Sequence, residues 1–453
     1  MKETLMAGFT GKGYQDVRYE YLEEVAIEYQ GENLKDISVS KKEGGHARGF
    51  YQGGWGHESF NNLEDVKEAI QTAISRADVA AKYREDSYKL AKAPVIEDKV
   101  VADPEINAKD ISLEEKRELV KKYNEMILEV EGITTTKASY YEINSHKYIA
   151  TNEGTYIDQE EPICGIRFLI YAKKGDVMQS IRASLGGSGD YKLLLNGEDK
   201  LMDAVEKVKQ MVDAEPVKAG NYPVIMDPSA AGVFIHEAFG HLSEADGVAD
   251  SPELRETMKL GREFGKTILN VIDDGSVMGH PGSIIYDDEG VPAKKTYLIK
   301  DGKLTGRLHS RETAGLMDEE LSGNCRAKDF TFNPVVRMSN IYIGEGDSTF
   351  EEMVSSIDDG LYLIGAAGGQ TSGNTFTLGT AYGYRIKDGE IKEMVRDIVI
   401  NCNLFETMAR ISMIGKDLTF SRAGGCGKAG QILIKSGKGA PHIKIDSITV
   451  AGK

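Results

Sequence analysis

One short segment carries the residues whose types and spacing could do chemistry. It reads Ala-Gly-Val-Phe-Ile-His-Glu-Ala-Phe-Gly-His and contains His236, Glu237 and His241. Imidazole is a preferred ligand of zinc, and a glutamate beside a ligand histidine can take a proton from water on the metal. The pattern predicts a metal-dependent hydrolase with Glu237 as the general base. The plainer alternative is an amphipathic core helix whose histidines are structural.

The spacing of the two histidines sets a condition on the backbone. In the familiar zincin motif the histidines lie four residues apart on one helical face, whereas His236 and His241 are five apart. On a regular α-helix, five residues rotate a side chain by about 140°, too far for two ligands of one ion. One π-type turn restores a common face, and Gly240 weakens the helix where that turn is needed. We therefore expect an irregular helix between the two histidines.

A zinc site with a position open for catalysis needs a third protein ligand. One candidate is Glu244, about one turn after His241. The other is Cys426, which lies in a Gly-Gly-Cys-Gly-Lys segment whose glycines let the backbone approach closely. Glu244 could instead orient a ligand histidine, because metal ligands are commonly held by such outer partners. Glu244 and Cys426 therefore both remain candidates for the third ligand.

The other candidate residues have no ligand spacing. Three of them could contact the substrate or stabilise the oxyanion of the transition state, and the sequence does not choose among them: His280, His309 and Arg337. Three further histidines are expected at the surface, two on N-terminal strands and one in a turn: His46, His57 and His146.

Two regions with different patterns of expected strands and helices surround the metal-binding segment. In the first, short strands are expected over residues 18–60 and further strands over 133–185. Helices are expected after Asn62, after a capping box of Ser112 and Glu115, and over residues 198–213. In the second, Asp227 caps the helix that carries the histidines, with Pro228 in its first position. Asp301-Gly302 and Asp388-Gly389 lie between alternating segments and predict β-hairpins.

These patterns predict an α+β fold in two domains. Residues 1–215 form an N-terminal strand-and-helix domain with a connector at about 84–110. Residues 220–453 form a C-terminal, mainly antiparallel β domain that carries the metal-binding helix. A length of 453 residues also favours more than one domain.

Composition limits the partners and the compartment. The net charge of −17 argues against a nucleic-acid backbone or an anionic membrane as the main partner. No segment has the length and apolarity of a membrane span, and the first residues lack a signal-peptide core. The four cysteines are scattered, unlike the dense framework of a disulfide-rich secreted protein. We expect a cytoplasmic protein.

Several separated blocks of the sequence resemble the TldD/PmbA family of metallopeptidases. The metal-binding helix, from His236 to Asp246, is the first of them. The others are Tyr286-Asp287-Asp288-Glu289-Gly290, Ser322-Gly323-Asn324, Pro334-Val335-Val336-Arg337-Met338 and Cys426-Gly427-Lys428-Ala429-Gly430-Gln431. The likeness spans nearly the whole chain.

The resemblance implies a site and a function. His236, His241 and Cys426 would hold the metal, and Glu237 would be the catalytic acid and base. The metal would be Zn²⁺, and Fe²⁺ is compatible with the same ligands. The substrates would be peptides or unfolded segments, which could pair with an exposed strand edge. The chain would form a homodimer or a heterodimer with a family paralogue that lacks the metal motif.

The choice of third ligand also has a physical argument. If Glu244 were a ligand, one irregular helix would have to point three side chains at one ion. Cys426 reaches the ion from another direction, and a thiolate binds zinc more strongly than a carboxylate. We predict that Cys426, and not Glu244, completes the site. Two alternatives to the peptidase are a non-proteolytic metal-dependent amide hydrolase and a non-catalytic partner subunit.

Overall fold

The computed structural model describes residues 1–84, 88–372, 375–422 and 424–452. It is a mixed arrangement of helices and sheets, so the predicted α+β class is confirmed. No helix in these ranges is both long enough and apolar enough to cross a membrane.

A seven-stranded sheet is formed by the N-terminal part of the chain. Its strands are β1 (Tyr14–Gln30), β2 (Asn33–Tyr51), β3 (Gly54–Phe60), β4 (Glu97–Val100), β5 (Ile133–Thr151), β6 (Tyr156–Lys174) and β7 (Val177–Ser188). The order is β3-β2-β1-β5-β6-β4, with β7 also paired to β6. The β4–β6 pair is parallel, and the other described pairs in this sheet are antiparallel.

The prediction of short strands over residues 18–60 was wrong. β1 has 17 residues and β2 has 19. The glycines inside β2 mark close packing and not turns. A Cβ on Gly45 would lie 2.2 Å from the ring of Phe60, and one on Gly49 would lie 2.6 Å from the backbone of Ile74 in helix α2 (Val66–Ala81). Glycine in a strand often marks such an approach, which a sequence pattern does not separate from a turn.

Three other expectations about this part of the chain need correction. The predicted connector contains β4, whose charged residues hid the strand; residues 85–87 of the connector lie outside the described ranges. His46 is buried at 5% exposure and its Nδ1 lies 2.9 Å from Ser59 Oγ, so it is not a surface residue. His146 lies within β5 and not in a turn.

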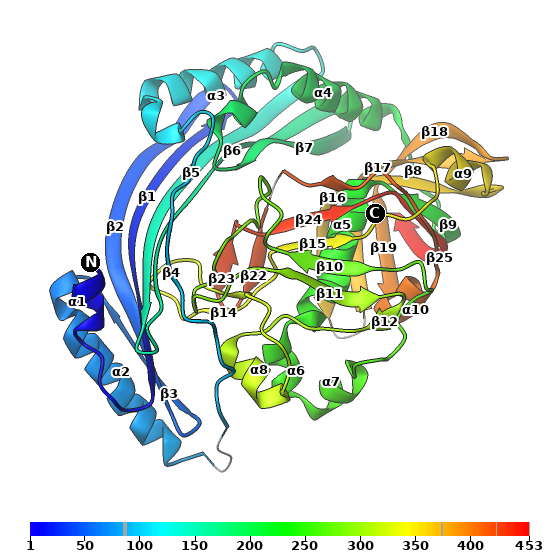
Figure 1. Cartoon of the computed structure of the whole chain (residues 1–453). Helices are drawn as coiled ribbons and strands as arrows, with labels where there is room; N and C mark the ends of the chain where they lie inside the picture. Colours follow the sequence, from blue (N-terminus) through cyan, green and yellow to red (C-terminus); the bar gives the residue numbers. More distant parts are fainter. Residues whose placement is uncertain (85–87, 373–374, 423, 453) are drawn as a thin grey trace.

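Helices cover the outer, convex face of this sheet (Figure 1). α2 packs on β2 and β3, α3 (Leu113–Leu128) on β5, and α4 (Glu198–Asp213) on β6 and β7. The predicted capping box is confirmed, because Ser112 and Glu115 satisfy each other's backbone N–H groups. The smaller elements of this part are α1 (Lys2–Met6), η1 (Leu63–Asp65), η2 (Ala108–Asp110) and η3 (Tyr191–Leu194).

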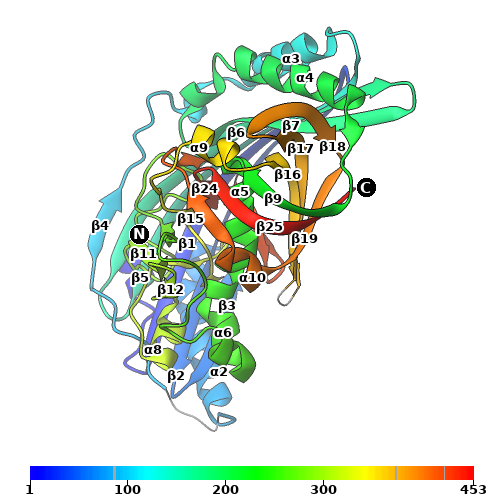
Figure 2. The same ribbon diagram turned by 90° about the vertical axis from the view of Figure 1, so that its right-hand side faces the viewer.

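The C-terminal half contains a barrel and a second sheet. The barrel strands are β9 (Gly220–Met226), β16 (Asp359–Ser372), β17 (Thr375–Lys387), β19 (Ile398–Asn403) and β25 (Ile443–Gly452). They pair in the closed order β16-β9-β25-β19-β17-β16, and Figure 2 shows the ring. The strands that extend it are β8 (Glu215–Pro216), β18 (Glu390–Arg396) and β20 (Ile411–Ile414).

The second sheet has six strands in the order β12-β11-β10-β15-β24-β21. They are β10 (Val271–Asp274), β11 (Lys295–Lys300), β12 (Lys303–Leu304), β15 (Asn340–Ile343), β21 (Thr419–Phe420) and β24 (Gly437–Ala440). Helix α5 (Pro228–Ile235) contacts β16 of the barrel and β24 and β15 of the sheet. The helix that leads to the histidines is therefore enclosed between two β layers, which explains its nearly apolar sequence.

The two predicted hairpins are confirmed. Asp301-Gly302 joins β11 to β12, and Asp388-Gly389 joins β17 to β18, each pair with positive φ at both residues. The remaining elements are α6 (Ala245–Asp250), α7 (Pro252–Thr257), α8 (Arg311–Met317), α9 (Phe350–Ser355), α10 (Leu404–Ala409), β13 (Cys325–Arg326), β14 (Val335–Val336), β22 (Cys426–Lys428) and β23 (Gln431–Leu433).

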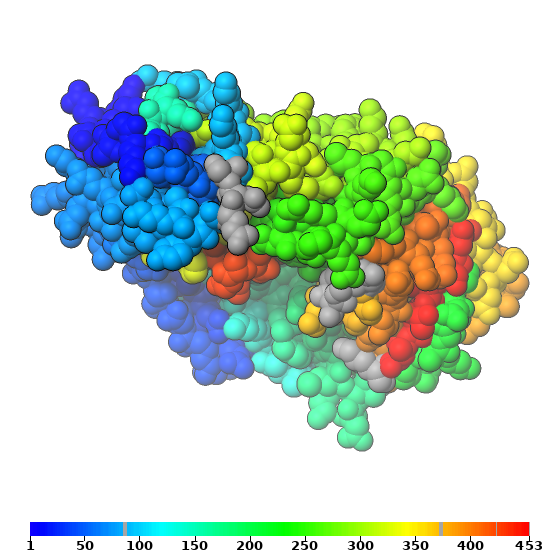
Figure 3. All heavy atoms as spheres, turned by 90° about the horizontal axis from the view of Figure 1, so that it is seen from below, coloured from blue at the N-terminus to red at the C-terminus, as the bar shows by residue number. Residues whose placement is uncertain are grey.

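The N-terminal sheet curves around the C-terminal half, and the two parts lie against each other in the view from below (Figure 3). Buried ion pairs join them. Arg18 Nη1 lies 2.8 Å from Asp288, Arg48 Nη2 lies 3.1 Å from Glu289, and Lys147 Nζ lies 3.0 Å from Asp288. All five side chains are at most 7% exposed, so the contact between the halves excludes water.

Candidate metal centre

The metal-binding helix begins as predicted. Asp227 accepts a hydrogen bond from the backbone N–H of Ala230, and Pro228 occupies the first helical position. After α5 the chain continues as the π-helix η4 (His236–Gly240) and the 3₁₀ turn η5 (His241–Ser243). The predicted irregularity between the histidines is thus confirmed.

The reason for Gly240 differs from the one expected. Its φ of −57° and ψ of −53° are ordinary helical values, so it is not needed for backbone freedom. A Cβ at this position would lie 2.1 Å from Met338 Sδ and 2.9 Å from Ile341 Cδ1. Glycine at this position lets the π-turn pack closely on the side chains of Met338 and Ile341. Ser243 supports the turn by donating its hydroxyl to Phe239 O at 2.9 Å.

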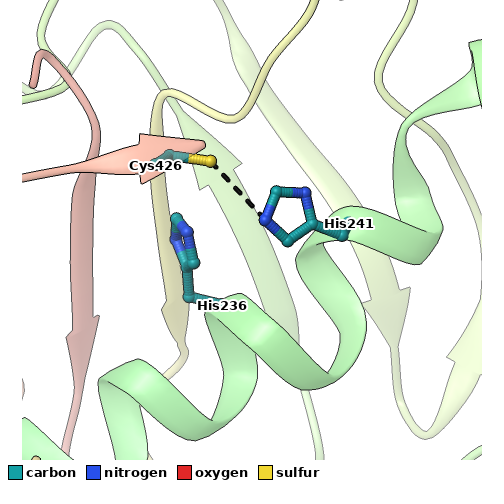
Figure 4. Close-up of side chains that lie close together, drawn as sticks. All are labelled: His236, His241 and Cys426. Carbon is teal, nitrogen blue, oxygen red and sulfur yellow. Dashed lines mark hydrogen bonds between the residues drawn. The ribbon is translucent and has the colours of Figure 1, made fainter. Parts of the chain in front are cut away.

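The π-turn brings both imidazoles to one side of the helix, facing Cys426 at the start of β22 (Figure 4). Potential ligand atoms of His236, His241 and Cys426 all lie within 4.8 Å of one another. Cys426 Sγ lies 3.5 Å from His241 Nε2. Two nitrogens and one sulfur at such separations suit the three protein ligands of a catalytic zinc site.

His236 is the most informative of the three. It is 1% exposed, and neither ring nitrogen has a hydrogen-bond partner among the described residues. Burial, followed by the charges of Lys438, His241 and Arg337, lowers its pKa well below the usual value, so the ring is neutral. A buried polar group without a partner costs about 1–3 kcal/mol. A metal ion would satisfy this neutral nitrogen, so the donor set fits the predicted cation.

Glu244 lies beside His241 and not among the grouped ligand atoms. Its Oε2 lies 3.0 Å from His241 Nδ1 and 3.0 Å from Lys428 Nζ. A proton on Nδ1 donated to Glu244 leaves Nε2, the nitrogen nearest to Cys426, as the lone-pair donor. Lys428 also reaches Asp246 at 2.7 Å, so it ties the Cys426 strand to the end of the helix.

The protonation of His241 follows from these contacts. Burial lowers its pKa, but hydrogen bonds with Cys426 and Glu244 outweigh burial and raise the pKa to about 10. The proton shared with Cys426 lies where a cation would bind. Metal binding would therefore release it, as is usual for sites with thiol and imidazole ligands.

Glu237 lines two cavities, which also share Gly369. One, of about 620 Å³, is also lined by His241 and Gly427; the other, of about 870 Å³, is also lined by Lys438. Burial raises the pKa of Glu237, opposed by the charges of His241 and Lys438. A carboxylate with a raised pKa, next to a candidate ligand and open to a cavity, is suited to accept a proton.

The three candidates for oxyanion contact lie elsewhere, and none lines either cavity beside Glu237. Arg337 is fully buried and donates to Cys426 O at 2.6 Å, so it supports the Cys426 strand. His309 is buried between Thr313 and Glu319. His280 stacks on Phe420.

Two lysines near the centre were not singled out from the sequence. Lys428 could have been found from the sequence, because residues two apart on a strand share a face and Cys426 lies two residues before it. Lys438 lies on β24, and no motif marked it. Burial lowers its pKa, and this is opposed by the nearby Glu237 and Cys426.

Comparison with known proteins gives matches along the chain. Residues 16–81, 106–213 and 219–452 match sequence models of domain 1, the central domain and the C-terminal domain of PmbA/TldA metallopeptidases. A metalloprotease of Synechocystis sp. is 36% identical over 440 residues, covering 96% of this chain and 94% of the relative. A zinc metalloprotease TldD homolog of Saccharolobus solfataricus is 31% identical, covering 98% and 97%.

A solved structure has the same fold. The structure of TldE from Thermococcus kodakarensis superposes with a TM-score of 0.75 at 19% identity, covering 100% of this chain and 99% of the other.

Proposed function

Because the chain belongs to the PmbA/TldD family of metallopeptidases, we propose that it is a zinc-dependent peptidase acting on peptides or unfolded segments. One observation carries the proposal. His236 is buried without a hydrogen-bond partner among the described residues, and it lies within ligand distance of His241 and Cys426. A structural core histidine would be expected to have such a partner.

The proposed ligands are His236, His241 and Cys426, and Glu244 holds His241 from behind. The borderline-soft donor set of two imidazoles and a thiolate suits zinc, and Fe²⁺ is also compatible. When bound, such an ion lowers the pKa of water and polarises the scissile carbonyl.

The chain's own residues supply the proton transfers. Glu237 takes a proton from the attacking water and passes it to the leaving amine nitrogen. Of the cations that line the cavity beside Glu237, Lys438 is the one whose charge interacts with Glu237, so we assign to it the contact with the developing oxyanion in place of Arg337, His280 or His309.

The substrate is proposed to bind as an added strand. β16 pairs with β17 on one side along its length, whereas β9 covers the other side only at Leu361–Leu363. Beyond Leu363 this edge has no strand partner in the described ranges. It passes the centre, because a Cβ on Gly369 would lie 3.1 Å from Glu237 Cγ. Main-chain pairing here would hold an extended peptide with little dependence on its side chains.

Association and compartment belong to the same proposal. We expect a dimer, homotypic or with a family paralogue, and the strand edge of β2 before Gly45 is a candidate contact. β3 pairs with β2 only from Gly45 onward, and Leu34, Ile37 and Val39 are 40–52% exposed. Light scattering would test this, and a monomer that cleaves peptides would contradict it.

All four cysteines are free thiols, which supports a reducing, cytoplasmic location.

The test combines metal analysis with a mixed peptide library. We expect about one zinc per chain and cleavage of extended peptides. Glu237→Gln should keep the metal and lose about 10²- to 10⁴-fold in rate, as for a general base. Activity within a few-fold of the parent would remove Glu237 from the mechanism. Hydrolysis of small amides without peptide cleavage would favour the other amide hydrolase, and no bound metal would favour the partner subunit.

A further inference from the structure

The larger cavity beside Glu237 has an unusual charge. Among the described residues that line it, six are cationic and two are acidic. The cations are Lys137, Arg167, Arg182, Lys200, Lys207 and Lys438, and the acids are Asp203 and Glu237. The whole chain has the opposite balance, 72 acidic against 55 basic residues. The positive charge is therefore a local property of this cavity.

The positive face is built mainly by helix α4 and by strands β6 and β7 of the N-terminal part. Lys200, Asp203 and Lys207 lie at helical spacing on one face of α4, so two of its lysines point the same way. Arg167 and Arg182 come from the neighbouring strands β6 and β7. The C-terminal half closes the cavity with β16 and with Lys438, so the cations stand across from the proposed peptide edge.

Three of these cations contact neutral backbone carbonyl oxygens. Arg167 donates to Gly424 O at 2.8 Å, Arg182 to Ala367 O at 2.9 Å and Lys200 to Ser184 O at 2.8 Å. Carbonyl acceptors are neutral, so the full positive charge remains. Burial and the nearby Arg422 lower the pKa of Lys200, as expected where cations crowd. Lys137 differs, because it pairs with Glu28 at 3.0 Å.

The smaller cavity has no such charge. Its described lining contains no lysine or arginine and includes Glu253. The two cavities share Glu237 and Gly369, so a peptide laid along β16 past Glu237 meets a cationic wall on one side only. Charge on the walls of a cleft concentrates ligands of opposite sign.

We propose that this cavity selects peptide segments that carry carboxylate groups on the α4 side of the cleavage site. The inference rests on the proposed peptidase function and adds a substrate class to it. The carboxylates belong either to Asp and Glu side chains or to the C-terminus of the peptide, and both would be bound by the same cations. Backbone pairing to β16 would be the same for every peptide, and the cations of the cavity would favour peptides that carry carboxylates.

The test compares matched peptides of one cleavable sequence. One set carries glutamate or glutamine on either flank, and a second set ends in a free carboxylate or an amide. We expect kcat/KM to favour glutamate on one flank only, by about two- to fivefold for each partly exposed ion pair. The preference should shrink as salt concentration rises. A preference confined to free C-termini would assign the cations to the terminal carboxylate.

Charge reversal on α4 locates the effect. Lys200→Glu with Lys207→Glu should remove or invert the preference while cleavage of the glutamine peptide stays within about twofold. The matched control is Lys209→Glu, which lies on the same helix, pairs with Glu206 and does not line the cavity. An equal change in the control, or no preference in the parent protein, would overturn the inference.

Failure of the proposed function gives a different result. If no peptide is cleaved, the peptidase proposal falls, yet fluorescence anisotropy of labelled peptides on the Glu237→Gln protein still measures binding. Tighter binding of the carboxylate-bearing peptide, lost in the α4 double variant and kept in Lys209→Glu, would support the cavity assignment alone. Equal binding of all peptides would contradict it.

Discussion

Two buried polar regions of this chain are built in opposite ways. Where the N-terminal sheet meets the C-terminal half, buried charges have partners. Asp288 accepts from Arg18, from Lys147 and, at 2.6 Å, from the backbone N–H of Ala327. Burial raises the pKa of Glu161, but Lys147 and Lys435 outweigh burial and hold it at about 2.

The candidate metal centre lacks this pairing at its most buried residue. Among the described residues His236 has no hydrogen-bond partner at either ring nitrogen. The backbone there is also irregular, with a π-turn pressed against Met338. His236 is as deeply buried as the paired charges, so the difference does not come from burial. Paired charges hold the two halves of the chain together. In contrast, a buried ring nitrogen without a hydrogen-bond partner, next to two other potential ligand atoms, indicates a binding site.

The largest effect should come from removing the proposed sulfur ligand. Cys426→Ser should lose most bound metal and activity, more than the about 10- to 100-fold of an outer partner. X-ray absorption on the parent protein should show one sulfur atom at about 2.3 Å from zinc. The control Cys402→Ser, on β19, should keep both metal and activity. A shell of nitrogen and oxygen alone would overturn the assignment.

The second effect breaks the paired region. Arg48 binds Asp16 through Nε and Nη2 and also reaches Glu289, all buried. Arg48→Met leaves two carboxylates without their cation and should destabilise the fold by about 3–5 kcal/mol in urea unfolding. The exposed pair of Arg385 and Asp359 is the control, and Arg385→Met should cost at most about 1 kcal/mol. Similar losses of unfolding free energy in both variants would show that the buried ion pairs stabilise the fold no more than an exposed pair does.

A smaller effect is expected from the residue that orients His241. Glu244→Gln keeps the shape but weakens the acceptor for His241 Nδ1 and removes one of the two acidic partners of Lys428. Zinc affinity, measured by competition with a chelator, should fall about 10- to 100-fold. Loss of all bound metal would make Glu244 a ligand, against the assignment of Cys426.

The effect that needs the most acid conditions is a pH dependence of the paired region. Because the pKa of Glu161 is about 2 in the folded chain and about 4.3 unfolded, its contribution to stability is present above about pH 4.3. It is lost as pH falls toward 2, at up to about 1.4 kcal/mol per pH unit. Glu161→Gln should flatten this slope in urea unfolding on the acid side. An unchanged slope would show that the carboxylate does not titrate with folding.

Local patterns in the sequence were enough for features that depend on neighbouring residues. Asp227 and Pro228 set the helix start, Ser112 and Glu115 the capping box, and each Asp-Gly pair its hairpin. The π-turn was also predictable, because a spacing of five residues forces it if both rings face one way. In contrast, the strands over residues 18–60 were predicted too short, because the packing of the β2 glycines depends on Phe60 and helix α2, which lie in other segments.

The sequence by itself therefore determined which residues could hold a metal and what their helix must do. Only the tertiary structure brought Cys426, 185 residues away, within 3.5 Å of His241. It also put Lys438 beside Glu237 and gathered the cations of α4, β6 and β7 around one cavity. The physical reason is the range of the interactions. Helix periodicity and capping act over a few residues, whereas ligand geometry and cavity charge depend on how distant strands pack.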